Sequence, residues 1–172
     1  MSTLAKFSEQ ASKHIAVFFG AGLIKPAPGT WGSLAALPVF LLVHLYGGFV
    51  GVVLATISVI FIGIWAIEKE TRGKDDHDPS EIVIDEVAGM WIALFPVSYG
   101  AQIMGAPILA LYPGWIAAFL AFRLFDITKP GPVGWADRRN DALGVMLDDV
   151  IAGIMAALTV IALGVAYHAV IL

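Results

Sequence analysis

Residues 34–67 read LAALPVFLLVHLYGGFVGVVLATISVIFIGIWAI and include no Asp, Glu, Lys or Arg. A membrane-spanning helix needs about 20 mainly apolar residues, so this stretch is long enough to cross a bilayer. As one straight helix it would run about 51 Å at 1.5 Å per residue, well beyond the roughly 30 Å of a hydrocarbon core. Gly47 and Gly48 provide a break in the middle. We therefore expect a helical hairpin, with a short arm over 34–46 and a longer arm over 49–67.

Two more stretches, 87–122 and 150–172, are also free of charged residues. Pro and Gly interrupt the first of them between positions 96 and 107, which predicts a second hairpin. The second stretch is expected to be one helix. Only 14% of all residues are charged, against about 25% in soluble domains. The sequence thus predicts an all-α, polytopic integral membrane protein of one domain, 1–172, with about five membrane segments and two helical hairpins.

The charged residues are confined to three segments, 1–33, 68–86 and 123–149. If both hairpins cross the membrane twice, the three segments lie on the same face. Because they hold every Lys and Arg of the chain, the positive-inside rule places that face in the cytoplasm. Within the single domain, 1–33 is expected to be a cytoplasmic N-terminal segment with a Gly/Pro-rich loop, and 150–172 the terminal membrane helix. A functional site is expected at the cytoplasmic membrane surface.

Composition excludes several classes of function. The net charge of −4 gives no basis for binding nucleic acid. The chain has no cysteine, which excludes disulfides and thiolate metal sites. Lys6, Glu9 and Lys13 interrupt the first residues, so no cleaved signal peptide is expected.

Two sequence elements match one another. Residues 82–89 read IVIDEVAG, and residues 145–153 read VMLDDVIAG. Each has three apolar residues, an acidic pair, and a Val followed by an Ala-Gly step, and each is expected to open an apolar helix. Gly89 and Gly153 would let the two helices approach closely, because small residues mark packed helix interfaces in membranes.

The acidic pairs of the two elements would then face each other at the membrane surface. Four carboxylates repel one another unless a cation lies among them, and hard oxygen ligands suit Mg²⁺ or Mn²⁺. The alternative is a solvated acidic rim, in which each pair only interacts with the dipole of its own helix. We predict a metal site formed by Asp85, Glu86, Asp148 and Asp149, with Asp126 or Asp137 completing the shell.

Segment 123–139, RLFDITKPGPVGWADRR, supplies positive charge. Pro130, Gly131 and Pro132 predict an irregular turn within it. Cations beside a carboxylate-bound metal suit a phosphoryl group, because the metal polarises one oxygen and the cations neutralise the others. The alternative is ordinary contact with lipid headgroups. We predict phosphate binding by Arg123, Lys129 and Arg138.

The loop 20–33, GAGLIKPAPGTWGS, has the spacing of neither a Walker A loop nor a dinucleotide-binding fingerprint. It does lead directly into a helix, and a Gly-rich turn at a helix N-terminus offers free N–H groups to an anion. Thr30 and Ser33 are expected either to cap that helix or to contact phosphate. In the acidic loop 68–81, His77 and Asp78 are further candidates for metal binding or acid–base chemistry.

Together these segments resemble the phosphatidylglycerophosphatase A family. The residues that carry the resemblance are KPAPGTWGS at 25–33, IVIDE at 82–86 with Gly89, FRLFD at 122–126 with Lys129-Pro130 and Asp137-Arg138, and DDVIAG at 148–153. No one motif is decisive, but the ordered set is specific and runs from about Gly20 to Gly153.

The resemblance implies a multi-pass enzyme of the bacterial inner membrane with Mg²⁺ as cofactor. Its substrate would be phosphatidylglycerophosphate, hydrolysed to phosphatidylglycerol and inorganic phosphate. The family's polar motif positions fall on Thr30, Ser33, Asp85, Glu86, Asp126, Lys129, Asp137, Arg138, Asp148 and Asp149. We expect catalysis at Asp85, Glu86, Asp126 and Asp149, with the nucleophile, a metal-activated water or an aspartate, left open.

Two other functions remain as alternatives. A CDP-alcohol phosphotransferase also uses acids at the membrane edge and a divalent metal, but its usual spacing of an Asp-Gly, an Ala-Arg and later Asp residues is absent here. A divalent-cation transporter predicts ionisable residues within the spans, yet the three uncharged stretches contain only His44 and His168.

Overall fold

The computed structural model describes residues 3–74 and 76–171, and the described residues form helices and connecting loops without a strand. The helices are α1 Thr3–Ala16, η1 Phe18–Leu23, α2 Pro28–Thr71, α3 Ile84–Ala93, α4 Phe95–Met104, η2 Ile108–Leu111, α5 Tyr112–Thr128, α6 Pro132–Asp137 and α7 Ala142–Ile171. Four helical stretches are long and apolar enough to cross a membrane: Pro28–Thr71, Ile84–Met104, Ile108–Thr128 and Ala142–Val170. The all-α prediction is therefore confirmed.

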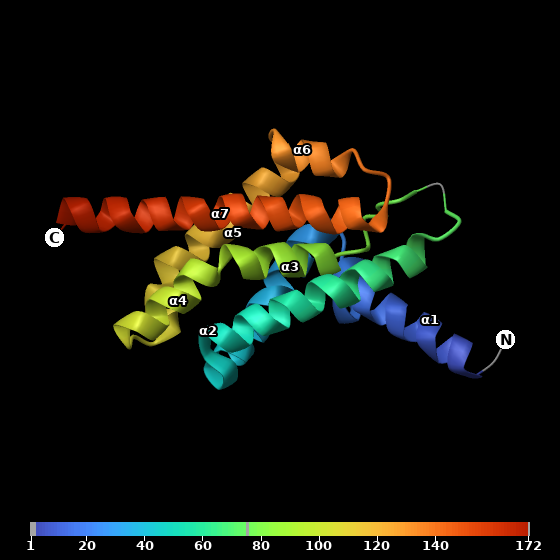
Figure 1. The fold of residues 1–172 in the computed structure, drawn as a ribbon, viewed down its shortest axis with the longest axis horizontal. Coiled ribbons are helices and arrows are strands. Elements are labelled where there is room, and N and C mark those ends of the chain that lie inside the picture. Colours follow the sequence, from blue (N-terminus) through green and yellow to red (C-terminus); the bar gives the residue numbers. More distant parts are fainter. Residues whose placement is uncertain (1–2, 75, 172) are drawn as a thin grey trace.

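The helix α2 is broken at Gly48, whose φ of 59° and ψ of −160° are not helical. Such a backbone conformation favours glycine, since any side chain there is strained. Figure 1 shows the chain folding back at this point, so that α2 consists of a first arm, 28–47, and a second arm, 49–71. The predicted break is confirmed, and both arms extend beyond the uncharged stretch into its polar flanks.

The stretch 87–122 is interrupted between α4 and η2, within the range 96–107 where Pro and Gly predicted a break. The helix α4 ends at Gly105, which has a φ of 60° and closes the helix with its backbone N–H. Pro107 precedes the short helix η2, and α5 follows. A left-handed Gly after a helix followed by Pro is a common way to end one helix and begin another.

The helix α7 begins at Ala142, eight residues before the expected start at 150. Its first turn is capped by Asp141, whose Oδ1 accepts a hydrogen bond from the N–H of Gly144 at 2.7 Å. Asp148 and Asp149 consequently lie inside the helix, and the expectation that this acidic pair opens it is wrong. At its other end the exposed part of α7 projects beyond the remaining helices (Figure 1).

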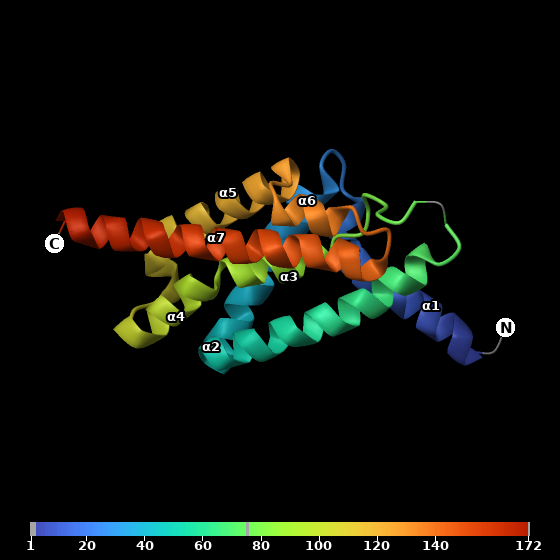
Figure 2. The same ribbon diagram turned by 45° about the horizontal axis from the view of Figure 1, so that its top comes forward.

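The helix α3 lies at the centre of the molecule, between α7 and the second arm of α2 (Figures 1 and 2). Nearly all its residues are buried. It contacts α7 where Gly89 and Gly153 meet, because a Cβ built on Gly153 would lie 2.4 Å from the carbonyl oxygen of Gly89. The predicted close approach of the two helices is thus confirmed, and it holds the two acidic pairs against each other.

Candidate active site

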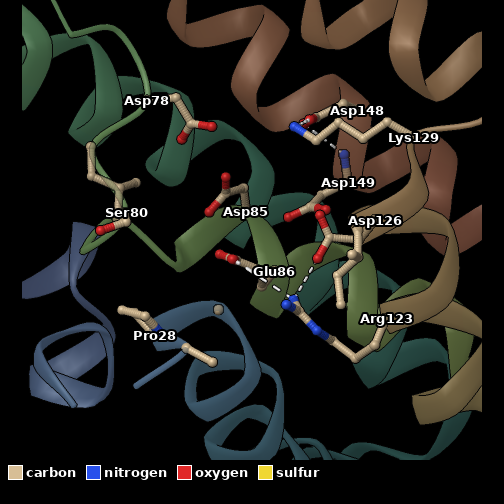
Figure 3. A pocket seen from close by; sticks show the side chains of 14 residues that line it. Pro28, Asp78, Ser80, Asp85, Glu86, Arg123, Asp126, Lys129, Asp148 and Asp149 are labelled. Atoms are coloured by element: carbon tan, nitrogen blue, oxygen red, sulfur yellow. Dashed lines mark hydrogen bonds and ion pairs between the residues drawn. The ribbon is translucent and has the colours of Figure 1, made fainter. Parts of the chain in front are cut away.

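A cavity of about 300 Å³ lies where the N-terminal ends of α2, α3 and α7 meet the C-terminal end of α5 (Figure 3). The loop between α2 and α3 forms another part of its wall. The cavity brings together carboxylates, two cations and a few apolar groups from segments far apart in the sequence. Its lining residues are Ala27, Pro28, Gly29, Asp78, Ser80, Ile82, Asp85, Glu86, Arg123, Asp126, Ile127, Lys129, Asp148 and Asp149.

Three of these acids, Asp85, Glu86 and Asp149, form a compact cluster. Each offers a carboxylate oxygen, and the three oxygens lie within 4.8 Å of one another. Asp85 and Asp149 are only 5% and 3% exposed. One oxygen of each of the three carboxylates accepts no hydrogen bond from any described residue. A buried carboxylate oxygen without a donor is costly, and a hard divalent cation such as Mg²⁺ would satisfy all three. The residues present therefore fit a metal ion.

Two cations face this acidic cluster from opposite sides of the cavity (Figure 3). Arg123 Nη1 lies 2.5 Å from Asp126 Oδ2 and 3.9 Å from Glu86 Oε1. Lys129 Nζ forms ion pairs with Asp137 and with Asp148 Oδ2, the second at 2.9 Å. The contacts of Lys129 are charge-assisted hydrogen bonds, which fix the direction of its ammonium group, and the ion pairs of Arg123 hold its guanidinium group beside the cavity.

The acids around Lys129 keep it charged. Burial alone would lower the pKa of its ammonium group, but the hydrogen bonds to Asp137 and Asp148 outweigh burial and raise the pKa above its ordinary value. At the mouth of the cavity, partial desolvation raises the pKa of the Asp78 carboxyl, and the charge of Lys129 opposes that rise. Lys129 therefore remains a cation throughout the physiological pH range.

Local sequence explains how the side chains reach the cavity. The helix α3 begins at Ile84, which places Asp85 and Glu86 in its first turn. Lys129 follows the end of α5 with a φ of 45°, and this left-handed residue turns the chain back over the site. Gly29 lies so close to the acids that a Cβ there would be 2.1 Å from Glu86 Oε1. A side chain at position 29 would therefore displace the carboxylate of Glu86 from its place in the cluster.

Most of the residues predicted for the site line this cavity, namely Asp85, Glu86, Arg123, Asp126, Lys129, Asp148 and Asp149. Four others do not. Asp137 lies outside the lining, where it pairs with Lys129, and Arg138 is exposed and also outside it. Ser33 is buried behind the wall and lies 3.5 Å from Arg123 Nη1. Thr30 is half-buried beside the lining residue Gly29.

The capping role considered for Thr30 and Ser33 is wrong. The residue before the first turn of α2 is Ala27, and no side chain caps the helix there. The helix starts at Pro28, so both hydroxyl residues already lie inside it. The hydroxyl of Ser33 instead donates to the carbonyl oxygen of Gly29, one turn earlier, at 2.8 Å.

Several lining residues were not among the predicted site residues, although some of them belong to the motifs that carry the family resemblance. Ala27, Pro28, Ile82 and Ile127 are apolar, and only the fold brings them to the cavity. Asp78 was considered only as an alternative, because it lies among other acids in a polar loop. His77, considered beside it, does not line the cavity. Gly29 also lines the cavity, and it belongs to the Gly-rich loop for which the sequence predicted anion binding.

A family model described as Phosphatidylglycerophosphatase A matches residues 14–164 of the chain. A protein of that name from Haemophilus influenzae is 38% identical over 151 residues, which cover 87% of this chain and 86% of the relative. Another of that name, from Escherichia coli, is 36% identical over 150 residues, covering 83% and 77%. A relative from Bacteroides thetaiotaomicron, 36% identical over 140 residues and covering 79% and 82%, is provisionally named a phosphatidylinositol-3-phosphatase. No solved structure matches the chain.

Proposed function

This chain belongs to the phosphatidylglycerophosphatase A family, and from that premise we propose that it is a lipid phosphatase acting on phosphatidylglycerophosphate. It hydrolyses the terminal phosphate monoester and yields phosphatidylglycerol and inorganic phosphate. The observation that carries the proposal is the cavity itself, in which the two buried carboxylates of Asp85 and Asp149 and the half-buried one of Glu86 lie opposite two cations, Arg123 and Lys129. This arrangement suits a phosphate group at the edge of an apolar helical body.

The proposal includes Mg²⁺, held by Asp85, Glu86 and Asp149. Support comes from the three carboxylate oxygens that no described residue satisfies. When bound, the ion would polarise a phosphate oxygen and add positive charge to the site. The cavity needs that charge, because six carboxylates and two cations line it. A phosphate dianion would be repelled by such a surplus of negative charge.

The chain's own cations orient the phosphate. Arg123 and Lys129 stand on different sides of the acidic cluster and can each donate to a phosphate oxygen. The acids that hold them, Asp126 for Arg123 and Asp148 for Lys129, restrict their movement. Fixed donors aimed at developing negative charge stabilise a transition state more than mobile ones do. Asp137 and Ser33 contribute by contacting Lys129 and Arg123 from outside the cavity.

The proposed membrane arrangement has five segments: the two arms of α2, then α3 with α4, η2 with α5, and α7. The first four form two hairpins that cross the bilayer and return, so all three charged segments lie on one side. The convergence of those segments at one cavity supports this arrangement (Figure 3). By the positive-inside rule that side is the cytoplasm, and the protein is a multi-pass protein of the bacterial inner membrane.

The test is phosphate release by the purified protein in detergent micelles that contain phosphatidylglycerophosphate. We expect release with Mg²⁺, none with EDTA, and none from Asp149→Asn at any Mg²⁺ concentration. Asp76→Asn is the matched control, since Asp76 is exposed and lies outside the cavity lining. A wild-type protein that leaves this lipid intact would contradict the proposal. Uptake of divalent metal into vesicles without any phosphate release would favour a transporter instead.

A further inference from the structure

Beside the cavity, side chains of the first arm of α2 reach side chains of α5 at two places. Ser33 Oγ lies 3.5 Å from Arg123 Nη1 near the cavity. Further along, the rings of Phe40 and Trp115 meet edge to face with centroids 5.6 Å apart. From the first contact to the second, the residue number increases on α2, from 33 to 40, and decreases on α5, from 123 to 115. The two helices therefore run in opposite directions, and their side chains meet at two places about two turns apart.

Apolar side chains border this line of contact on both helices. On α5, Ile116, Leu120, Arg123 and Ile127 share one face, since their spacing is that of a helical stripe. The three apolar members of the stripe are exposed. On α2, Leu34 follows Ser33 directly and Leu37 lies one turn after it, and both keep accessible surface. We call the surface formed by Leu34, Leu37, Ile116, Leu120 and Ile127 the α2–α5 seam.

The seam is continuous with the polar cavity. Ile127 belongs to both, because it lines the cavity and is 68% exposed on the outside of α5. Arg123, on the same stripe, points into the cavity (Figure 3). At its other end the seam runs toward Trp115, into the apolar part of the molecule. A phosphate site at one end and an apolar track leading away from it match the two ends of a phospholipid.

We propose that the α2–α5 seam binds the glycerol backbone and an acyl chain of the substrate, which enters sideways from the bilayer with its phosphate leading. This inference rests on the proposed function. Sideways entry keeps the acyl chains in apolar surroundings, whereas entry from the aqueous side would expose them to water. Other exposed apolar surfaces, such as the end of α7 beyond Ile161, lack this continuity with the cavity.

Single-cysteine variants give the test, because the chain contains no cysteine of its own. Leu120→Cys places a thiol in the seam, about two helical turns from Ile127 and outside the cavity lining. Leu158→Cys is the matched control, since Leu158 on α7 has the same exposed fraction, 61%, as Leu120. Each variant is labelled with a bulky maleimide and assayed on long-chain phosphatidylglycerophosphate and on a water-soluble dibutyryl analogue.

Labelling at position 120 is expected to lower kcat/KM for the long-chain lipid at least tenfold, mainly through KM. Hydrolysis of the soluble analogue should stay within twofold, which also reports an intact fold and site. Labelling at position 158 should change neither rate. Equal efficiency on the long-chain lipid after labelling at 120, or an equal loss on both substrates, would overturn the seam proposal. Unlabelled protein that hydrolyses neither substrate would instead contradict the proposed function.

Discussion

The acidic pair of α3 and the acidic pair of α7 face each other across one cavity but occupy different turns of their helices. Asp85 and Glu86 lie in the first turn of α3, which starts without a side-chain cap. Asp148 and Asp149 lie in the second turn of α7, whose start is capped by Asp141. Interaction with the helix dipole therefore explains the acids of α3 in part, but it explains those of α7 poorly, because the effect fades within the first turn.

The partners of the two pairs show a second difference. In each pair one acid faces a cation: Glu86 lies 3.9 Å from Arg123, and Asp148 lies 2.9 Å from Lys129. The other acid, Asp85 or Asp149, is buried and forms no ion pair with a described residue. Asp85, Asp149 and also Glu86 each have an oxygen without a partner among the described residues. The comparison shows that the two acidic pairs are similar in sequence, but that the cations beside them in the fold decide what each acid can do. The unpartnered acids need a cation from outside, whereas Asp148 holds one that the chain supplies.

The largest expected effect separates the two acids of α7. Asp149→Asn should lower kcat/KM for phosphatidylglycerophosphate by about 10³-fold or more, because it removes a proposed metal ligand and its charge. Asp148→Asn should lower it by about 10- to 100-fold, because Asp148 acts by holding Lys129 in place and residues that orient the groups of a site have effects of this size. Phosphate release under saturating Mg²⁺ measures both. Equal losses in the two variants would remove the distinction drawn between them.

The next effect concerns the contact between Gly89 and Gly153, which brings the acidic pairs of α3 and α7 together. Gly153→Ala should destabilise the protein by about 3 kcal/mol or more, because the new methyl group would meet the backbone of Gly89, which cannot move aside easily. Gly164→Ala, in the same helix, is the control. Nothing lies within 4 Å of a Cβ there, so this variant should be unchanged or slightly more stable. Thermal unfolding in detergent compares them, and equal melting temperatures would refute the role of the crossing.

A third effect follows from the unpartnered oxygens. Added Mg²⁺ should stabilise the wild-type protein by about 2.7 kcal/mol at a concentration 100 times its Kd. Asp149→Asn should lose most of this gain and, in EDTA, should melt above the wild-type protein, because one of the mutually repelling carboxylates is gone. Asp148→Asn should keep the gain. A wild-type melting temperature that ignores Mg²⁺ would contradict the assignment of the metal ligands.

The smallest effect distinguishes the capped helix from the uncapped one. Asp141→Ala should cost about 1 kcal/mol, the usual value of an N-cap. Hydrogen bonds from Arg139 and from the Gly144 amide lower the pKa of Asp141 in the folded protein. A lowered folded pKa means that this contribution is present above about pH 4, the unfolded value, and is lost as pH falls further.

Chemical unfolding of the wild-type protein and Asp141→Ala at pH 7 and at pH 3 measures this difference. The gap between the two proteins should be present at pH 7 and shrink at pH 3. The residue before α3, Val83, forms no capping hydrogen bond. It is not used as a control variant, because Val83 is buried and its replacement would change packing and not a cap. A gap for Asp141→Ala that persists unchanged at pH 3 would argue against the cap.

Much of the fold could be predicted from the sequence, because a helix that can span a bilayer needs a long apolar stretch without charged residues. Uncharged stretches gave the helices, and Gly48 and Gly105 ended them where predicted. The helix α7 was placed too late because the capping signal at Asp141 lies in a charged segment that was assigned to a loop. The same assignment hid α1 and α6, which form within the polar segments.

The sequence by itself determined that the protein is helical, that its charges gather in three segments, and that two Gly-containing elements carry acids. Hydrophobic length and residue type suffice for these conclusions, since both act locally along the chain. Only the tertiary structure decided which acids remain without partners, that Lys129 is shared by Asp137 and Asp148, and that Asp137 and Arg138 stay outside the cavity. Those outcomes depend on how α3, α5 and α7 cross. A shift of a few ångströms decides whether an acidic side chain can reach a metal ion in the cavity or only lies beside it.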